Sequence, residues 1–141
     1  MIADSYEELY PLLNDQVQFL FEYAQSLSKT EQYIESNEVL KRAMQISCDP
    51  MLYNVMGNNH KQMGEYGKAE SMYLHASHII PHRHYPLYLL MKLYKEMEEK
   101  GEAEGAGEKA KAMAETLLEK PVKIPSTAIR EMQEEARKIK N

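Results

Sequence analysis

Apolar residues recur along this chain at spacings of three and four, which is the period of an amphipathic α-helix. Proline and glycine interrupt the pattern at intervals, and no stretch shows the alternation of a strand bounded by hairpin turns. The pattern therefore predicts an all-α protein. The expected helices cover residues 5–10, 12–29, 33–47, 51–63, 66–80, 86–99, 107–119 and 126–139.

Local signals predict how several of these helices begin and end. A capping box is expected at Ser5 and Glu8, and Pro11 should interrupt the first helix because proline lacks the N–H donor. The pair Asp49-Pro50 should end one helix and open the next. Gly64 is expected to adopt the left-handed conformation that commonly terminates a helix.

The C-terminal residues predict an extended link followed by one more helix. Pro121 and Pro125 bracket three residues that should be extended, and Ser126 or Thr127 then supplies an N-cap. The apolar face of the last helix is expected to consist of Ile129, Met132, Ala136 and Ile139.

Large and small residues alternate in a pattern that repeats with a period of about 34 residues. In the strongest copy, from Pro50 to Arg83, the small residues are Gly57, Ala69 and Ala76, and the large ones include Tyr53, Met56 and Tyr73. Small residues allow close approach of helices, and large ones fill the space beside those contacts. The preceding copy places Leu20, Tyr23, Ala24, Leu27, Ser36, Leu40 and Ala43 at matching positions. The following copy places Leu87, Leu90, Met91, Tyr94, Ala110, Ala114 and Leu117 there.

This pattern resembles the tetratricopeptide repeat (TPR), with His60 as a departure where the family has tyrosine and Met91 where it has a small residue. The resemblance implies a solenoid of about three antiparallel helix pairs with flanking and capping helices. The expected organisation is a flanking helix at 1–16, repeats at 17–49, 50–83 and 84–119, and a linker with a capping helix at 120–141. The glycine-rich segment 98–107 is an insertion between the helices of the last repeat, read either as an exposed loop or as extensions of both helices.

Composition narrows the classes of function. The net charge of −5 disfavours general nucleic-acid binding, which requires an excess of lysine and arginine. Cys48 is the sole cysteine, so a disulfide-stapled domain is excluded. The N-terminus has no signal-peptide pattern, and no apolar run approaches the about 20 residues of a membrane span. The cellular location stays open, including tethering to a membrane domain in a longer protein.

The resemblance also predicts where a partner would bind, because the first helix of each TPR pair lines a concave groove. The groove residues expected here are Phe21, Gln25, Lys29, Asn54, Asn58, Lys61, Tyr85, Tyr88, Lys92 and Lys95. Their rings, amides and lysines predict a locally basic groove for an extended or helical peptide of acidic character. The alternative interpretation is an ordinary solvated surface with no ligand.

No catalytic, cofactor or metal site is predicted. Ser71 with His75, and Cys48 with any histidine, lack the orienting acid that an activated nucleophile needs. The histidines at 75, 78, 82 and 84 are close in sequence, but a proline interrupts them, and solvated or turn-capping roles are favoured over metal binding. His60 is expected to be packed between helices.

A narrower resemblance involves two short stretches, 82–94 (HRHYPLYLLMKLY) and 120–132. Both are similar to the C-terminal TPR region of bacterial O-antigen ligase/polymerase-like membrane proteins. That resemblance implies a soluble, non-catalytic tail that recruits or regulates partners in surface-polysaccharide assembly. The alternatives are a free-standing TPR scaffold or co-chaperone adaptor, and an enzyme whose site the sequence does not reveal.

Overall fold

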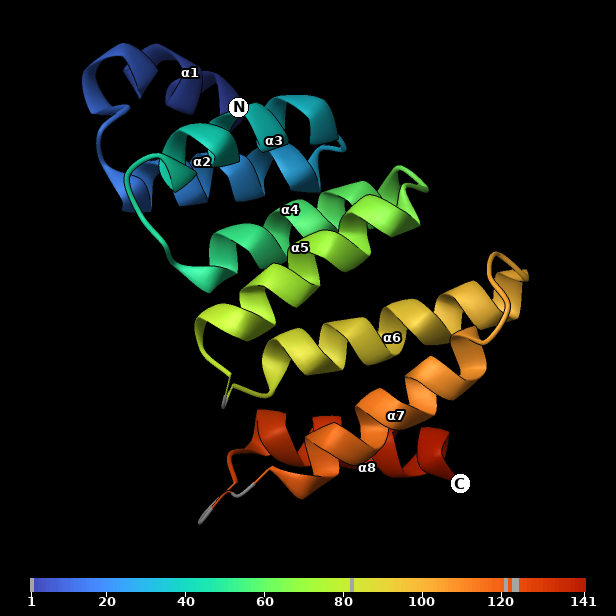
Figure 1. Cartoon of the computed structure of the whole chain (residues 1–141). Coiled ribbons are helices and arrows are strands. Elements are labelled where there is room, and N and C mark those ends of the chain that lie inside the picture. The colour runs from blue at the N-terminus through green and yellow to red at the C-terminus, as the bar shows by residue number, and fades with distance from the viewer. Residues whose placement is uncertain (1, 82, 121, 123–124) are drawn as a thin grey trace. The chain divides into compact units, whose positions relative to one another are not determined.

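The computed structural model describes residues 2–81, 83–120, 122 and 125–141, and within these ranges it contains helices and no strand (Figure 1). The predicted all-α class is therefore confirmed. The helices are α1 (Ile2–Leu13), α2 (Val17–Lys29), α3 (Tyr33–Met44), α4 (Pro50–Gln62), α5 (Tyr66–Ile79), α6 (Tyr85–Lys100), α7 (Ala106–Glu119) and α8 (Thr127–Lys140).

Three of the predicted helix ends have the expected local geometry. The Asp49 carboxylate accepts a hydrogen bond of 2.9 Å from the backbone N–H of Met51, and Pro50 occupies the first turn of α4. Gly64 ends α4 with a φ of +77°, and the N–H of Glu65 bonds the carbonyl of His60 at 2.8 Å. Ser126, one of the two predicted caps, accepts from the N–H of Ile129 at 3.2 Å.

The N-terminal helix differs from its prediction. It begins at Ile2 and runs through Pro11 to Leu13, so Ser5 lies inside the helix and the predicted capping box is wrong. Pro11 has no N–H donor, so it removes one backbone hydrogen bond from the last turn of α1, where only a few such bonds remain to be formed. The side-chain amide of Asn14 then donates to the carbonyls of Tyr10 and Pro11 and completes the terminus. Consequently α2 begins at Val17, not at residue 12.

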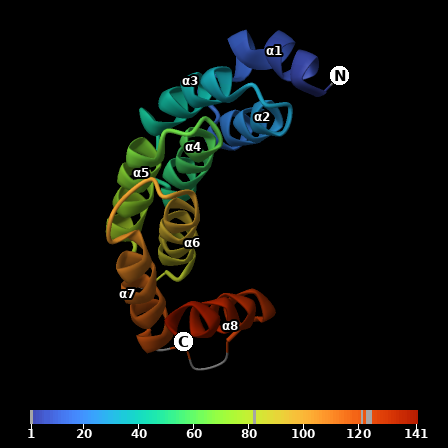
Figure 2. The ribbon, with the colours of Figure 1, turned by 90° about the vertical axis from the view of Figure 1, so that its right-hand side faces the viewer.

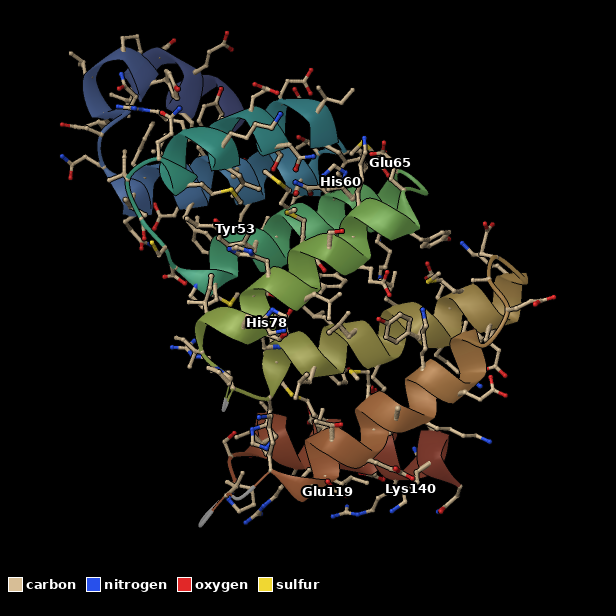
Figure 3. The ribbon with its side chains drawn as sticks, viewed as in Figure 1. Tyr53, His60, Glu65, His78, Glu119 and Lys140 are labelled. Atoms are coloured by element: carbon tan, nitrogen blue, oxygen red, sulfur yellow. The ribbon has the colours of Figure 1, made fainter. Side chains whose placement is uncertain are left out.

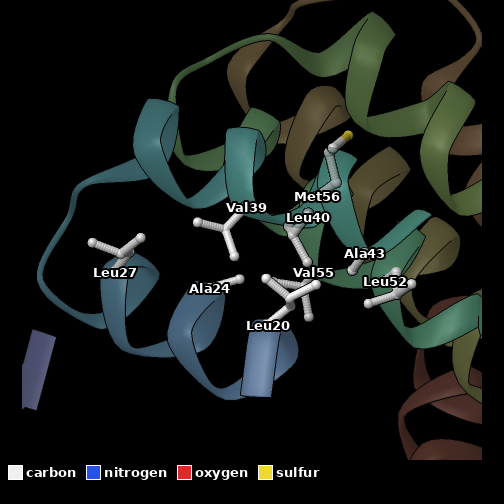
Figure 4. Packing of buried hydrophobic residues seen from close by; sticks show 9 residues of the cluster. All are labelled: Leu20, Ala24, Leu27, Val39, Leu40, Ala43, Leu52, Val55 and Met56. Carbon is white, nitrogen blue, oxygen red and sulfur yellow. The ribbon is translucent and has the colours of Figure 1, made fainter. Parts of the chain in front are cut away.

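The described residues form two compact units, Met1–Met72 and Tyr73–Asn141. In the first unit α2 and α3 pack side by side, and α3 also contacts α4 (Figures 1 and 2). Figure 4 shows the apolar cluster at their centre. Its buried members are Leu20, Ala24, Leu27, Val39, Leu40, Ala43, Leu52, Val55 and Met56. Met72, in the N-terminal half of α5, packs against this cluster, as expected if α5 reverses along α4.

The second unit contains the end of α5 together with α6, α7 and α8. Helix α7 packs against both α6 and α8, which lie on the same side of it (Figure 2). Ala106, Ala110 and Ala114 recur every four residues along α7 and are buried. Such a stripe of small side chains allows close helix packing. Met91, at a position predicted to be small, is fully buried on α6.

Burial agrees with the predicted repeat pattern in each copy. Gly57, Ala69 and Ala76 are buried, as are the predicted core positions of the neighbouring copies apart from the half-buried Tyr23. Half of the glycine-rich segment 98–107 is helical, because α6 extends to Lys100 and α7 begins at Ala106. Gly101 and Gly105, both with positive φ, bound a short exposed connection. Of the predicted extended link, residues 121, 123 and 124 lie outside the described part of the chain.

Candidate functional site

The helix α6 carries four of the predicted groove residues along one side. The rings of Tyr85 and Tyr88 are stacked, with centroids 6.4 Å apart and planes inclined by 29°. The Nζ atom of Lys92 lies 5.2 Å from the centroid of the Tyr88 ring, which is within the range of a cation–π contact. Spacings of three and four residues bring these side chains together on successive turns.

Helix α8 supplies the opposite wall of this site. The hydroxyl group of Tyr88 donates a hydrogen bond to the carboxylate of Glu135. Burial, this bond and the nearby negative charges raise the pKa of Tyr88 to about 12, because each of them favours the neutral phenol. Tyr88 therefore joins α6 to α8 through a charge-assisted contact.

A pocket of about 320 Å³ opens between α6 and α8. Its lining consists of Lys92, Lys95, Glu96, Glu99, Glu135, Lys138 and Ile139. Two of the predicted groove lysines thus face one cavity. The cavity holds three lysines and three glutamates, so in this unit the structure does not support the prediction of a locally basic surface. Glu96 and Glu99 of α6 and Glu135 of α8 balance the charges of the three lysines.

One lysine of this pocket, Lys95, has a weak ion-pair partner outside the pocket lining. Lys95 lies 3.6 Å from Glu98, and both side chains are substantially exposed. An exposed pair of this kind contributes at most about 1 kcal/mol, so its lysine can exchange partners at little cost. The pocket, which we call the α6–α8 pocket, combines an apolar residue, three aliphatic lysine stems and charges of both signs.

The predicted groove residues of the first unit have more varied surroundings. Phe21 is half-buried and packs against the apolar cluster. Gln25 and Lys29 line a hollow of about 230 Å³ beside α1. Asn58 and Lys61 are half-buried on α4.

Asn54 has different surroundings from those predicted, since it is only 1% exposed. Its Nδ2 atom lies 3.6 Å from the sulfur of Met51, and its Oδ1 atom has no hydrogen-bond partner among the described residues. The amide is thus part of the packed interior and does not form an open groove surface.

A buried polar network in the first unit was not anticipated. The amide nitrogen of Asn59 donates to the Ser36 hydroxyl at 2.9 Å and to Asn37 Oδ1 at 2.8 Å. Ser36 donates to the carbonyl of Ala24 at 2.7 Å, and Ser28 donates to Asn59 Oδ1. Ser28 thereby helps to join α2, α3 and α4. The available signal was Ser36, a polar residue at a position that the repeat pattern buries.

The histidines have separate roles. His60 is largely buried, and its Nδ1 lies 3.0 Å from a carboxylate oxygen of Glu65 at the α4–α5 turn (Figure 3). Hydrogen bonds from His60 and then Lys68 lower the pKa of Glu65. His75 and His78 are exposed, and His82 lies outside the described residues. No group of three or more potential metal-ligating side chains converges anywhere in the described ranges.

His84 corrects the expectation of a solvated or capping role. It occupies the N-cap position of α6, but its side chain makes no capping bond and is 8% exposed. Burial, assisted by the charge of Lys120, lowers its pKa. The neutral imidazole is therefore the form that the fold favours.

Comparison with known proteins locates the fold among repeat proteins. No family model matches the sequence, and no curated protein matches it. The TPR domain of Sgt2 from Aspergillus fumigatus matches with a TM-score of 0.67 and 15% identity, over 87% of this chain and 78% of that one. A chain of the CopN–Scc3 complex matches with a TM-score of 0.65 and 18% identity, over 96% and 75% of the two chains.

PcrH in complex with the chaperone-binding region of PopB is also similar, with a TM-score of 0.64 and 12% identity over 89% of this chain and 94% of that one. These similarities, with the helix pairs described above, define the class: the chain has the TPR-like helical solenoid fold, as its repeat pattern predicts. None of the described helices is long and apolar enough to cross a membrane.

Proposed function

We propose that this chain is a non-catalytic protein-interaction module that binds a peptide segment of a partner at the α6–α8 pocket. The observation that carries the proposal is the convergence of Lys92 and Lys95 on one cavity together with Ile139. Apolar surface at the floor and charged groups at the rim are the usual composition of a peptide-binding site.

The pocket chemistry indicates the kind of segment that fits. An apolar side chain would cover Ile139 and the lysine stems, and carboxylates beside it would replace the weak pairing of Lys95 with Glu98. In the first unit, the proposal extends to Phe21, Gln25, Lys29, Asn58 and Lys61.

The fold supports this proposal independently. PcrH, which has a similar fold, is described in complex with the chaperone-binding region of PopB. That complex belongs to PcrH, and it provides a precedent for peptide binding by such helix arrays.

The test is the affinity of the whole chain for a labelled amphipathic peptide built from Ala, Leu and Glu, with Arg in place of each Glu as the control peptide. We expect Lys92→Ala to weaken binding of the acidic peptide by about fivefold, since it removes one partly exposed charge contact. Lys111→Ala is the matched control, because Lys111 is exposed on α7 and does not line the pocket. Asn58→Ala tests whether the predicted groove residues of the first unit contribute to binding.

Equal affinity of the Lys92→Ala and Lys111→Ala variants for the acidic peptide would contradict binding at the α6–α8 pocket. If the acidic peptide does not bind at all, the proposed preference for an acidic segment is wrong. A loss of affinity in the Asn58 variant alone would place the binding site in the first unit.

The biological context is a separate proposal. The resemblance of residues 82–94 and 120–132 supports a role as the C-terminal tail of an O-antigen ligase-like membrane protein in surface-polysaccharide assembly. The alternative is a free-standing scaffold or co-chaperone adaptor. Sequencing the full gene distinguishes them: many membrane spans encoded before Met1 favour the tail, and a start codon there favours the adaptor.

A further inference from the structure

The acidic excess of this protein is concentrated at its N-terminal end. Residues 1–39 contain eight acidic side chains and one basic side chain, Lys29. The remaining residues contain fourteen acidic and sixteen basic side chains, so they carry no acidic excess. The negative potential of the chain therefore arises in the segment that forms α1, α2 and the first part of α3.

This acidic segment contains a cavity with aromatic walls. A pocket of about 340 Å³ is lined by residues from α1, α2 and α3, and we call it the tyrosine pocket. Its lining consists of Glu7, Tyr10, Pro11, Tyr23, Glu38 and Val39. The rings of Tyr10 and Tyr23 meet edge to face, with centroids 6.1 Å apart. Two tyrosine rings, a proline and a valine form apolar walls, and two carboxylates stand at the exposed rim.

The negative charge acts on the aromatic wall itself. Burial raises the pKa of Tyr23, and the neighbouring Glu7 carboxylate adds to that effect. Glu7 is therefore close enough to Tyr23 to influence its ionisation. A cation beside the Tyr23 ring would interact with both the carboxylate and the ring face.

Glu38, which supplies the second carboxylate of the tyrosine pocket, can exchange its ion-pair partner. Glu38 pairs with Lys41 at 3.2 Å, but the two side chains are 67% and 63% exposed. Such a solvated pair within one helix contributes only a few tenths of a kcal/mol. An incoming cation can thus replace Lys41 at small cost.

We propose that the tyrosine pocket receives an arginine or lysine side chain from a basic segment of a partner protein. The aliphatic stem lies between Tyr10, Tyr23 and Val39, and the cationic group lies between Glu7 and Glu38. Long cationic side chains suit this arrangement because their stems are apolar and their ends are charged. This site belongs to the first unit and is proposed to bind a basic segment, whereas the α6–α8 pocket is proposed to bind an acidic one, so the two proposals can fail separately.

The experiment measures binding of the peptide built from Ala, Leu and Arg to the whole chain, with the Glu-containing peptide as the control. We expect saturable binding of the Arg peptide that weakens with added salt. Glu7→Gln and Glu38→Gln should each reduce the affinity about fivefold. Glu8→Gln is the matched control, because Glu8 is exposed on the same helix and does not line the pocket. The affinity of the Glu8→Gln variant for the Arg peptide should change by less than about twofold, because a charge outside the pocket is screened by salt.

Several outcomes would overturn this proposal. A loss of affinity in the Glu8 variant equal to that in the Glu7 variant would indicate diffuse attraction without a pocket. Equal binding of both peptides, or no saturable binding of the Arg peptide, would also contradict it. If sedimentation shows self-association of the free chain that Glu7→Gln abolishes, the pocket is occupied by another copy of this chain and the partner proposed here is wrong. Unchanged circular dichroism of each variant confirms that folding is intact.

Discussion

At the scale of single residues, the first unit depends on one buried amide as well as on its apolar cluster. Asn59 uses both ends of its side chain, donating to Ser36 and Asn37 and accepting from Ser28. These partners belong to α2 and α3, so a single side chain on α4 fixes how three helices align. Polar networks of this kind stabilise a fold only when every member is satisfied.

Replacing Asn59 by alanine should therefore lower the free energy of unfolding by about 2–3 kcal/mol, since buried polar groups lose their partners together. Gln62→Ala, at an exposed position on the same helix, is the control and should change it by less than about 0.5 kcal/mol. Urea denaturation measures both. A cost for Asn59→Ala as small as that of the control would mean that water replaces the lost bonds.

At the scale of elements, Gly64 lies in the turn before α5 and Gly67 lies in the first turn of α5. Replacement by alanine should have opposite effects on stability at these two positions. Gly64 has a φ of +77°, whereas Gly67 lies within α5 without a positive φ, and an added Cβ would meet no atom within 4 Å at either position. Steric contact is thus the same in both cases. Only the backbone conformation distinguishes them.

Gly64→Ala should destabilise the protein by about 1 kcal/mol, because alanine is strained in the left-handed region. Gly67→Ala should stabilise it by about 0.5 kcal/mol, because alanine favours the helix and restricts the unfolded chain. Thermal unfolding of the two variants gives the signs directly. Destabilisation of similar size in both would contradict the assigned turn.

The sequence predicted those elements whose ends depend on a few neighbouring residues, such as Asp49 with Pro50, Gly64 and Ser126. It mispredicted α1, where a local signal competes with packing. Tyr6 packs against Phe19 and Tyr23 of α2, and Tyr10 packs against Tyr23, with ring centroids between 5.4 and 6.1 Å apart. Such contacts between helices favour a continuous α1 despite Pro11, and spacing within one helix does not reveal them.

The candidate sites show the same limit. The positions of Lys92 and Lys95 followed from helical spacing within α6. The contribution of Glu135 did not, because it depends on which side chains a later helix brings to the same cavity. Likewise, Asn54 occupied a predicted surface position, and only the packed structure reveals its burial.

At the scale of the whole molecule, the TPR-like fold offers binding surfaces that are assembled from several helices. Helix pairs present side chains from several helices on shared surfaces, and charge then selects the partner. In this chain the acidic residues are concentrated toward the N-terminus, while lysines are distributed over the later helices. Two pockets of different charge, the tyrosine pocket and the α6–α8 pocket, would allow the chain to join two unlike partners.

The most direct test of the central claim is amide hydrogen exchange of the whole chain, free and saturated with the peptide of Ala, Leu and Glu. If the α6–α8 pocket binds the peptide, exchange should slow in α6 and in α8, and the Lys92→Ala variant should reduce that protection at the same peptide concentration. Protection confined to α7, or equal protection in the Lys92→Ala and Lys111→Ala variants, would contradict the account.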